Sequence, residues 1–422
     1  MRIMWLTSQL LPKVAKQLNK EDQGSGGWVP AMLEQLQYSG SVEAIDIVSV
    51  YNLNEVLSFS DDRIKYTLLP STNGVFKYDP NLWKYLSKEI ESFKPDIIDV
   101  QGIEFFLSRS LLDVKINTPI IATLHGLTSE IHKHFFAGIP IIELLRNRTF
   151  RDNILFDGII ERKYRYKARG ENEIFVLKKI KNVFGRTRWD EVVALQHNKD
   201  LQYFKCNNNL NEVFYSQKWE LAKVKRHSLF TTQAHYPIKG LHKLLEALSL
   251  LVLKYPNICL YVAGKNMIKR QTLYERLAFS GYQKYIRRLI KRFKLQNHVV
   301  FTGYLNPEEI VEQLKKTHVF VIPSMIENSP TALAEAQMVG TPSVAALVGG
   351  VADYVDHGNT GLLYNCNEPI MLSDKIEQIF MDDSLALRLS ENAKKAATER
   401  HDKTKNCKAL LSAYSTIINK KE

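Results

Sequence analysis

Short apolar runs typical of strands alternate with amphipathic runs typical of helices along almost the whole chain. This alternation limits the possible folds more than any other feature. Strands are predicted at 2–6, 45–50, 97–101, 119–124, 229–233, 259–263, 299–302, 319–323 and 343–345, and helical periodicity lies between them, as at 29–37, 241–253 and 285–294. Strands separated by helices form parallel sheets with helices on both faces. The predicted class is therefore α/β with doubly wound, Rossmann-like sheets, which bind ligands beyond the carboxyl ends of their strands.

The chain has 422 residues, which is too long for one such sheet, because a single hydrophobic core rarely exceeds about 300 residues. The boundary is predicted within 218–226, ahead of the strand at 229–233. We predict one Rossmann-like domain at 1–222, a second at 223–403, and a final helix at 404–422 that packs back on the first domain.

Positive charge is concentrated in one segment. The chain carries a net charge of +12, and residues 146–188 contain thirteen Lys and Arg against five Asp and Glu, with aromatic residues interleaved. Three interpretations stay open: a solvated basic face, docking on an anionic membrane, and nucleic-acid binding. The last has the least support, since no recognisable nucleic-acid motif accompanies the charge.

The cysteines indicate a reducing compartment. Cys206, Cys259, Cys366 and Cys407 are far apart and form no Cys-x-x-Cys pair, which argues against a zinc site or a disulfide framework. The N-terminus resembles a first strand more than a signal peptide. No apolar run approaches the roughly 18 residues that span a bilayer. We therefore expect a cytoplasmic protein, with peripheral contact at the inner face of the cytoplasmic membrane if the basic segment docks there.

The segment 323–336, Pro-Ser-Met-Ile-Glu-Asn-Ser-Pro-Thr-Ala-Leu-Ala-Glu-Ala, follows a very apolar strand. Ser329-Pro330 predicts a helix start, with Ser329 as N-cap and Pro330 at the first helical position. The N–H groups of Thr331 and Ala332 would then point outward at the positive end of the helix dipole. This arrangement predicts a phosphate site.

Two carboxylates flank that predicted helix start. Glu327 lies in the loop before the helix and Glu335 one turn inside it, so they can reach different parts of one ligand. Carboxylate oxygens accept hydrogen bonds from vicinal hydroxyls, such as those of a sugar or a ribose. The alternative is an ordinary helix N-terminus with two solvated acids.

Three further segments are candidate ligand-binding segments, because each lies at a strand end or before a helix and contains glycine. Lys239-Gly240 opens a helix after a strand, and His125-Gly126 ends the strand at 119–124. Gly26-Gly27 precede a helix, where consecutive glycines let backbone N–H groups approach a phosphate. Each also has a plain structural explanation: a solvated lysine, a hydrogen-bonded histidine and a flexible loop.

Gly340-Thr341-Pro342 and Gly349-Gly350 complete a recognisable pattern. With Glu327 and Glu335, which are separated by seven residues, they resemble the donor-binding segment of the GT4 family, the glycosyl transferases group 1 of GT-B fold. The resemblance follows the element order of the whole chain and is most specific from 237 to 361. It implies two Rossmann-like domains facing across a cleft, with the acceptor on the N-terminal domain and the nucleotide sugar on the C-terminal one.

The resemblance also implies residue roles. His125 would contact the transferred sugar, Lys239 would bind the donor pyrophosphate, and Glu327 completes the catalytic set. The implied donor-binding residues are Gly26, Gly27, Arg186, Lys239, Glu327, Asn328, Ser329, Thr331, Ala332 and Glu335. Weaker candidates are Gly102 and Glu104 for the acceptor, and Gly264, Lys265, Gly303 and Tyr304 for the base.

One family feature is missing. The arginine usual five or six residues before the lysine is replaced by Gln233 and Ala234, and Lys265 and Arg186 are the candidate substitutes. No Asp-x-Asp triplet, the metal-holding motif of the other large glycosyltransferase fold, occurs in the sequence. We therefore expect neither a metal nor another cofactor, with a cation stabilising the leaving diphosphate.

The predicted function is retaining transfer of a sugar from a UDP- or GDP-sugar to a glycan or polyprenyl-diphosphate-linked acceptor, in bacterial capsule, exopolysaccharide or lipopolysaccharide synthesis. The basic segment 146–188 would contact the anionic membrane, and nucleic acid is not an expected partner. Two alternatives stay open. One is a related nucleotide-sugar epimerase or phosphorylase, although no acid/base pair or pyridoxal-phosphate lysine is evident. The other is a non-enzymatic, basic nucleic-acid-binding protein.

Overall fold

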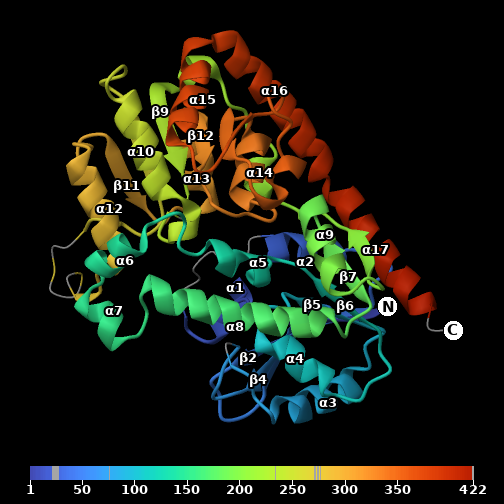
Figure 1. The fold of residues 1–422 in the computed structure, drawn as a ribbon. Helices are drawn as coiled ribbons and strands as arrows, with labels where there is room; N and C mark the ends of the chain where they lie inside the picture. Colours follow the sequence, from blue (N-terminus) through green and yellow to red (C-terminus); the bar gives the residue numbers. More distant parts are fainter. Residues whose placement is uncertain are drawn as a thin grey trace. The chain divides into compact units, whose positions relative to one another are not determined.

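The computed structural model describes residues 1–20, 28–75, 77–232, 234–269, 272, 275 and 277–420. The chain divides into two compact units. Unit 1 comprises Met1–Glu130, Lys167–Leu210 and His401–Glu422, and unit 2 comprises Ile131–Tyr166 and Asn211–Arg400. Each unit contains one sheet with helices packed on it (Figure 1).

The sheet of unit 1 has eight strands in the order β3-β4-β2-β1-β5-β6-β7-β8. All neighbouring pairs are parallel except the antiparallel pair of β3 and β4. The strands are β1 (Arg2–Thr7), β2 (Ala44–Tyr51), β3 (Leu57–Asp61), β4 (Ile64–Pro70), β5 (Ile97–Gln101), β6 (Ile120–Thr123), β7 (Asn182–Gly185) and β8 (Gln202–Lys205).

The sheet of unit 2 has six parallel strands in the order β11-β10-β9-β12-β13-β14. They are β9 (Lys225–Thr231), β10 (Cys259–Ala263), β11 (Val299–Gly303), β12 (Thr317–Ile322), β13 (Ser343–Ala346) and β14 (Leu362–Tyr364). Every residue of the central strand β12 is buried, as a strand covered on both faces requires.

Helices connect the strands in both units. In unit 1 they are α1 (Pro12–Gln17), α2 (Trp28–Gln37), α3 (Leu82–Phe93), α4 (Phe106–Leu112), α9 (Arg188–His197) and α17 (Lys403–Asn419), with the short α5 (Thr128–Ile131) at a unit boundary. In unit 2 they are α6 (Ile141–Asn147), α7 (Phe150–Ile154), α10 (Leu241–Leu251), α12 (Gly281–Arg292), α13 (Pro307–Lys316), α14 (Thr331–Val339), α15 (Pro369–Met381) and α16 (Asp383–Arg400). Helix α8 (Ile159–Leu177) begins in the segment assigned to unit 2 and ends in one assigned to unit 1.

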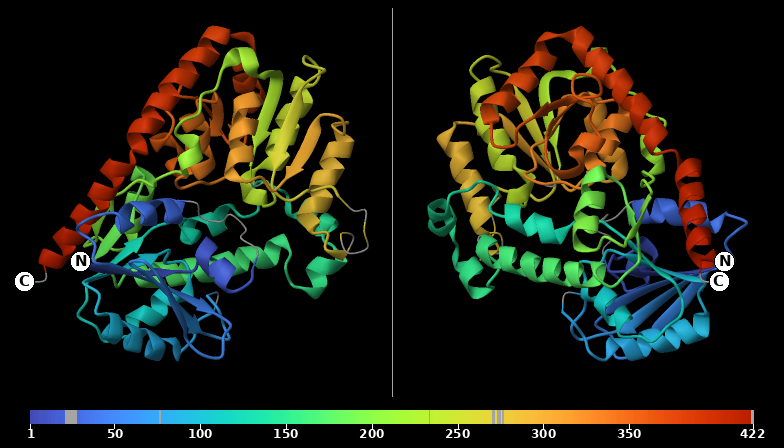
Figure 2. Two further views of the ribbon diagram at one scale, coloured as in Figure 1. Left: turned by 180° about the vertical axis from the view of Figure 1, so that it is seen from behind. Right: turned by 45° about the vertical axis from the view of Figure 1, so that its right-hand side comes forward.

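Alternating side chains of β1 show why each sheet is wound on both faces. Met4 and Leu6 pack into one apolar cluster with residues of α3 and α4, whereas Ile3 and Trp5 pack into another with residues of α2 and α17. In unit 2, α10 packs beside α15 and α13 beside α14, and Figure 2 shows helices on both sides of its strands. The predicted α/β class with two doubly wound sheets is confirmed.

The strands that sequence periodicity missed lie mainly at sheet edges. β3, β8 and β14 are edge strands, and β3 is largely exposed. A short or half-exposed strand carries little apolar signal. The predicted final helix at 404–422 corresponds to α17, which begins at Lys403 after α16 ends at Arg400. Among the described residues, no helix combines the length and apolarity needed to cross a bilayer.

Residues 131–166 belong to unit 2, although the prediction assigned them to the N-terminal domain. His242 of α10 lies 2.8 Å through its Nε2 from the carbonyl oxygen of Ala137. The backbone N–H of Gly281 donates to the Asp152 carboxylate at 2.8 Å. These contacts join segments that lie far apart in the sequence, so no local pattern shows them. The domain boundaries 1–222, 223–403 and 404–422 stay a prediction.

Candidate active site

A small hollow lies at the carboxyl edge of the sheet of unit 2, beyond the ends of β9 and β12. Its volume is about 200 Å³. Five of the predicted donor-binding residues line it: Lys239, Glu327, Ser329, Thr331 and Ala332. The position agrees with the rule that doubly wound sheets bind ligands beyond their strand ends.

Lys239 and Glu327 form the centre of this hollow. The Lys239 Nζ donates to the Glu327 Oε1 at 2.6 Å, and the Ser324 hydroxyl donates to the same oxygen at 2.7 Å. The two charged side chains are 23% and 12% exposed, so each keeps a face open to a ligand. The hollow therefore holds a cation and an oriented carboxylate in direct contact.

Glycines allow the loops of the hollow to approach each other. Gly240 has φ +71°, and a Cβ there would lie 1.8 Å from the carbonyl oxygen of Pro323. Gly349 has φ +49°, and a Cβ there would lie 2.0 Å from the carbonyl oxygen of Glu327. The next N–H, of Gly350, donates to that same oxygen at 3.0 Å. The Gly-Gly pair thus holds the backbone of Glu327 in place, and at Gly349 only a residue without a side chain permits this approach.

The helix start differs from the prediction by one residue. Pro330, not Ser329, is the N-cap of α14, with ψ 101° outside the helical range, and no side chain caps the helix. The carbonyl of Pro330 accepts from the N–H groups of Leu333 and Ala334. Thr331 and Ala332 are therefore the first two helical residues, whose N–H groups have no intrahelical acceptor. Both residues line the hollow, so the predicted anion site remains consistent with the corrected helix start.

Two predicted residues of this segment do not line the hollow. Asn328 is buried, with 6% exposure. Glu335 lies one turn into α14, and burial raises the pKa of its carboxyl group to about 8. A carboxyl with this pKa is mostly protonated at neutral pH and can donate as well as accept a hydrogen bond. Their roles in donor binding stay predictions.

In unit 1, three predicted residues meet beyond the ends of β5 and β6. A Cβ on Gly102, which has φ +93°, would lie 3.1 Å from the His125 Nδ1 and 2.9 Å from the Glu104 Oε2. Burial, followed by the charge of Arg186, lowers the pKa of His125 to about 3. Burial raises the pKa of Glu104, against the opposing effect of Arg169. His125 is therefore neutral at physiological pH and suited to hydrogen bonding rather than to carrying charge.

Arg186 is fixed inside unit 1 and is only 3% exposed. Its Nε donates to the Asn208 Oδ1 at 2.7 Å, and its Nη1 donates to the carbonyl oxygen of Leu124. Its charge acts on His125 within the same unit. Its predicted donor contact stays a prediction, while its contact with Leu124 ties it to the strand end that carries His125.

The lowered pKa of His125 predicts a pH dependence of stability. An exposed imidazole binds a proton near pH 6.5, whereas the folded chain resists protonation of His125 until about pH 3. Its contribution to stability is thus fully present above about pH 6.5 and is lost as the pH falls toward 3. We expect His125→Gln to make the decline in the free energy of unfolding shallower over this interval, as measured by urea denaturation. His134→Gln, at an exposed histidine, is the control, and equal slopes for His125→Gln and wild type would contradict the assignment.

Sequence reasoning missed one cation near Lys239. Arg162, Lys239 and Lys265 all act electrostatically on His235, whose pKa is lowered to about 4 by burial and then by these charges. The Arg162 guanidinium carbon lies 5.8 Å from the ring centre of Tyr236. Arg162 comes from α8, far from Lys239 in the sequence, and no motif connects them. Together with the predicted Lys265, it is a candidate substitute for the missing family arginine.

Those of the remaining predicted residues that the structure describes are not found in the donor hollow. Gly26, Gly27 and Gln233 lie outside the described residues, and Ala234 is buried. Tyr304 is 74% exposed, and Gly264 pairs with Gly303 beside it. Within the described residues, no group of three His, Cys, Asp or Glu side chains is arranged to hold a metal ion.

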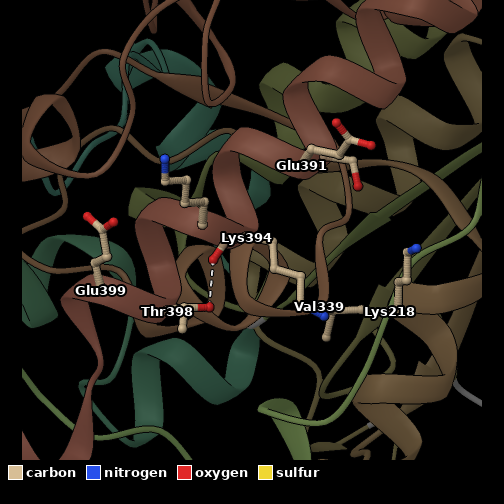
Figure 3. Close-up of a pocket in the computed structure, with 8 residues that line it drawn as sticks. Lys218, Val339, Glu391, Lys394, Thr398 and Glu399 are labelled. Carbon is tan, nitrogen blue, oxygen red and sulfur yellow. Dashed lines mark hydrogen bonds between the residues drawn. The ribbon is translucent and has the colours of Figure 1, made fainter.

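A larger hollow of about 440 Å³ also lies in unit 2, between Val339 at the end of α14 and the helix α16. Figure 3 shows its charged side chains, with the Thr398 hydroxyl donating to the backbone carbonyl of Lys394 at 2.8 Å. It lies at the carboxyl end of α14, where the helix dipole is negative and disfavours anions. No predicted site residue lines it, so the smaller hollow is the better candidate.

Comparisons with known proteins agree with the predicted family. Residues 214–396 match the family model described as glycosyl transferases group 1. An uncharacterized glycosyltransferase, YqgM, of Bacillus subtilis (strain 168) is 21% identical over 377 residues, covering 87% of this chain and 93% of the relative. A D-inositol 3-phosphate glycosyltransferase of Corynebacterium urealyticum is 28% identical over 186 residues, covering 43% of this chain and 41% of the relative.

Solved structures share the fold over nearly the full length. The sucrose-phosphate synthase of Thermosynechococcus elongatus has a TM-score of 0.71 at 16% identity and covers 99% of both chains. The Anabaena protein HepE, solved in complex with UDP and glucose, has a TM-score of 0.64 at 16% identity and covers 98% of this chain and 99% of its own. At these identities the likeness shows a common fold.

Proposed function

We propose, from the premise that this chain is a group 1 glycosyltransferase of GT-B fold, that it transfers a sugar from a UDP- or GDP-sugar to a glycan or lipid-linked acceptor with retention at the anomeric carbon. One observation carries the proposal. Lys239, Glu327 and the uncapped start of α14 line a single hollow. A nucleoside diphosphate sugar combines the diphosphate and the hydroxyls that such a hollow can bind. The family premise leaves the non-enzymatic alternative and the epimerase or phosphorylase alternative without support.

The chemistry follows from the charges in the hollow. The N–H groups of Thr331 and Ala332 offer hydrogen bonds and positive helix-dipole charge to the diphosphate. Lys239 offsets the negative charge that develops when the sugar leaves. Glu327 accepts hydrogen bonds from sugar hydroxyls. Because Lys239 also contacts Glu327, at 2.6 Å, a bound diphosphate competes with this carboxylate for Lys239, and Glu327 gains acceptor capacity for the sugar.

The UDP present in one solved structure of the same fold, the HepE complex, makes a UDP-sugar the first donor to test.

The acceptor is proposed from the charge distribution of the chain. The basic segment 146–188 supports a polyprenyl-diphosphate-linked acceptor at a membrane, and with it a role in bacterial surface-polysaccharide synthesis. His125, neutral and grouped with Glu104 in unit 1, is proposed to contact the transferred sugar.

The test is release of nucleoside diphosphate from a panel of UDP-, GDP- and ADP-sugars, without acceptor and with EDTA present. We expect slow release from one donor, unchanged by EDTA, because Lys239 and α14 supply positive charge without a metal. Glu327→Ala should strongly reduce this release. The proposal would be wrong if no nucleotide sugar of the panel released diphosphate and none shifted the melting temperature of the protein. Retention is checked separately by the anomeric configuration of the product.

A further inference from the structure

Exposed apolar side chains are concentrated in one short stretch of unit 2. Among the described residues, seven of the 22 exposed large hydrophobic side chains lie within 141–156. They are Ile141, Ile142, Leu145, Phe150, Ile154, Leu155 and Phe156, each at least 52% exposed. Single exposed hydrophobic residues need no explanation, but seven within sixteen residues of the chain indicate an interaction surface. We name these seven residues the apolar patch.

The apolar patch is carried by fixed elements. Helices α6 and α7 meet at Thr149, whose side chain forms a capping box with Asp152. Arg288 of α12 donates to Glu143 and to the Asn147 Oδ1, both at 3.0 Å. Figure 1 shows α6 beside α12. The exposed apolar side chains therefore belong to a segment that is bonded to α12 within unit 2.

Positive charge borders the apolar patch. Helix α12 contains Lys284, Arg287, Arg288, Lys291 and Arg292 and no acidic residue. Beyond α7, Arg151, Arg162 and Arg165 share the carboxylate of Asp157, and Arg151 also pairs with Asp152. Three cations against two carboxylates leave this cluster with surplus positive charge. Aliphatic and aromatic tips next to basic residues are the combination by which peripheral proteins insert into anionic lipid.

We infer that the apolar patch and the adjoining α12 dock unit 2 on an anionic lipid bilayer. A second copy of the chain fits this surface poorly, because a symmetric interface would bring two α12 helices with like charges together. Free nucleic acid would use the cations but leave the seven apolar side chains in water. The inference deepens the proposed function. Unit 2, which carries the donor hollow, is then the part held at the membrane. The domain expected to bind the acceptor is not.

Vesicle flotation tests this docking with the full-length protein. Wild type is expected to float with vesicles that contain phosphatidylglycerol and not with pure phosphatidylcholine. Because each phenylalanine loses its apolar insertion, Phe150→Asp with Phe156→Asp should lower the bound-to-free ratio by at least about tenfold. Leu253→Asp is the matched control, since Leu253 is also in unit 2 and is 84% exposed. It should float like wild type.

Donor turnover separates this inference from the proposed function. Acceptor-independent release of nucleoside diphosphate should be equal in wild type and all these variants, because none of them lines the donor hollow. Flotation without turnover in any panel donor would support docking and count against the proposed function. Turnover with no flotation, or flotation unaffected by the two Phe→Asp changes, would overturn docking. A wild-type dimer in sedimentation that these changes dissociate would also overturn it, in favour of self-association.

Discussion

Lys239→Ala is expected to lower the rate of nucleoside diphosphate release from the donor by about a thousandfold, since removing one preorganised group that stabilises developing charge costs 10²–10³ in rate. The Nζ of Lys239 is the cation that lines the donor hollow, and it contacts Glu327 at 2.6 Å. Its loss removes the counter-charge of the leaving diphosphate and leaves the Glu327 carboxylate facing that anion. Steady-state kinetics with the donor identified by the panel measure the effect.

Matched variants show whether the effect belongs to the hollow. Lys223→Ala removes a lysine whose side chain is 71% exposed in the same unit and should leave turnover unchanged. Because Lys239 and Glu327 are in contact, the double variant with Glu327→Ala should lose less than the product of the single losses. A Lys239→Ala enzyme that keeps wild-type turnover would refute this role.

Gly349→Ala is expected to reduce turnover by about a hundredfold, a loss that displacing a catalytic group by roughly 1 Å can cause. The new Cβ would lie 2.0 Å from the carbonyl oxygen of Glu327, which neither backbone can accommodate without moving. The left-handed conformation, φ +49°, adds about 1–2 kcal/mol for a residue with a side chain. Both the free energy of unfolding and kcat/KM should fall.

Gly358→Ala separates the cost of the positive φ from the steric contact with Glu327. Gly358 also has a positive φ, +80°, but a Cβ there would meet nothing within 4 Å. It should lose about 1–2 kcal/mol of stability from conformation alone and keep its turnover. If Gly349→Ala lost no more activity than Gly358→Ala, the proposed support of Glu327 by the glycine pair would be wrong.

The central strands and the donor segment could be predicted because their signals are local. β5 and β10 were predicted with the bounds that the structure has, since buried parallel strands read as short apolar runs. Lys239, Glu327 and Thr331 were expected in one donor site because their segments resemble the GT4 family, and all three line the hollow.

The sequence by itself therefore determined the two doubly wound sheets, and it predicted five of the residues that line one hollow. Only the tertiary structure decided that residues 131–166 join unit 2, that Arg162 acts beside Lys239 on His235, and that Arg186 is buried beside the strand end of His125. It also decided that α14 starts after Pro330. Periodicity and capping preferences report on neighbours within a few residues. These four facts depend on contacts or backbone angles set by packing between distant segments, which no local pattern encodes.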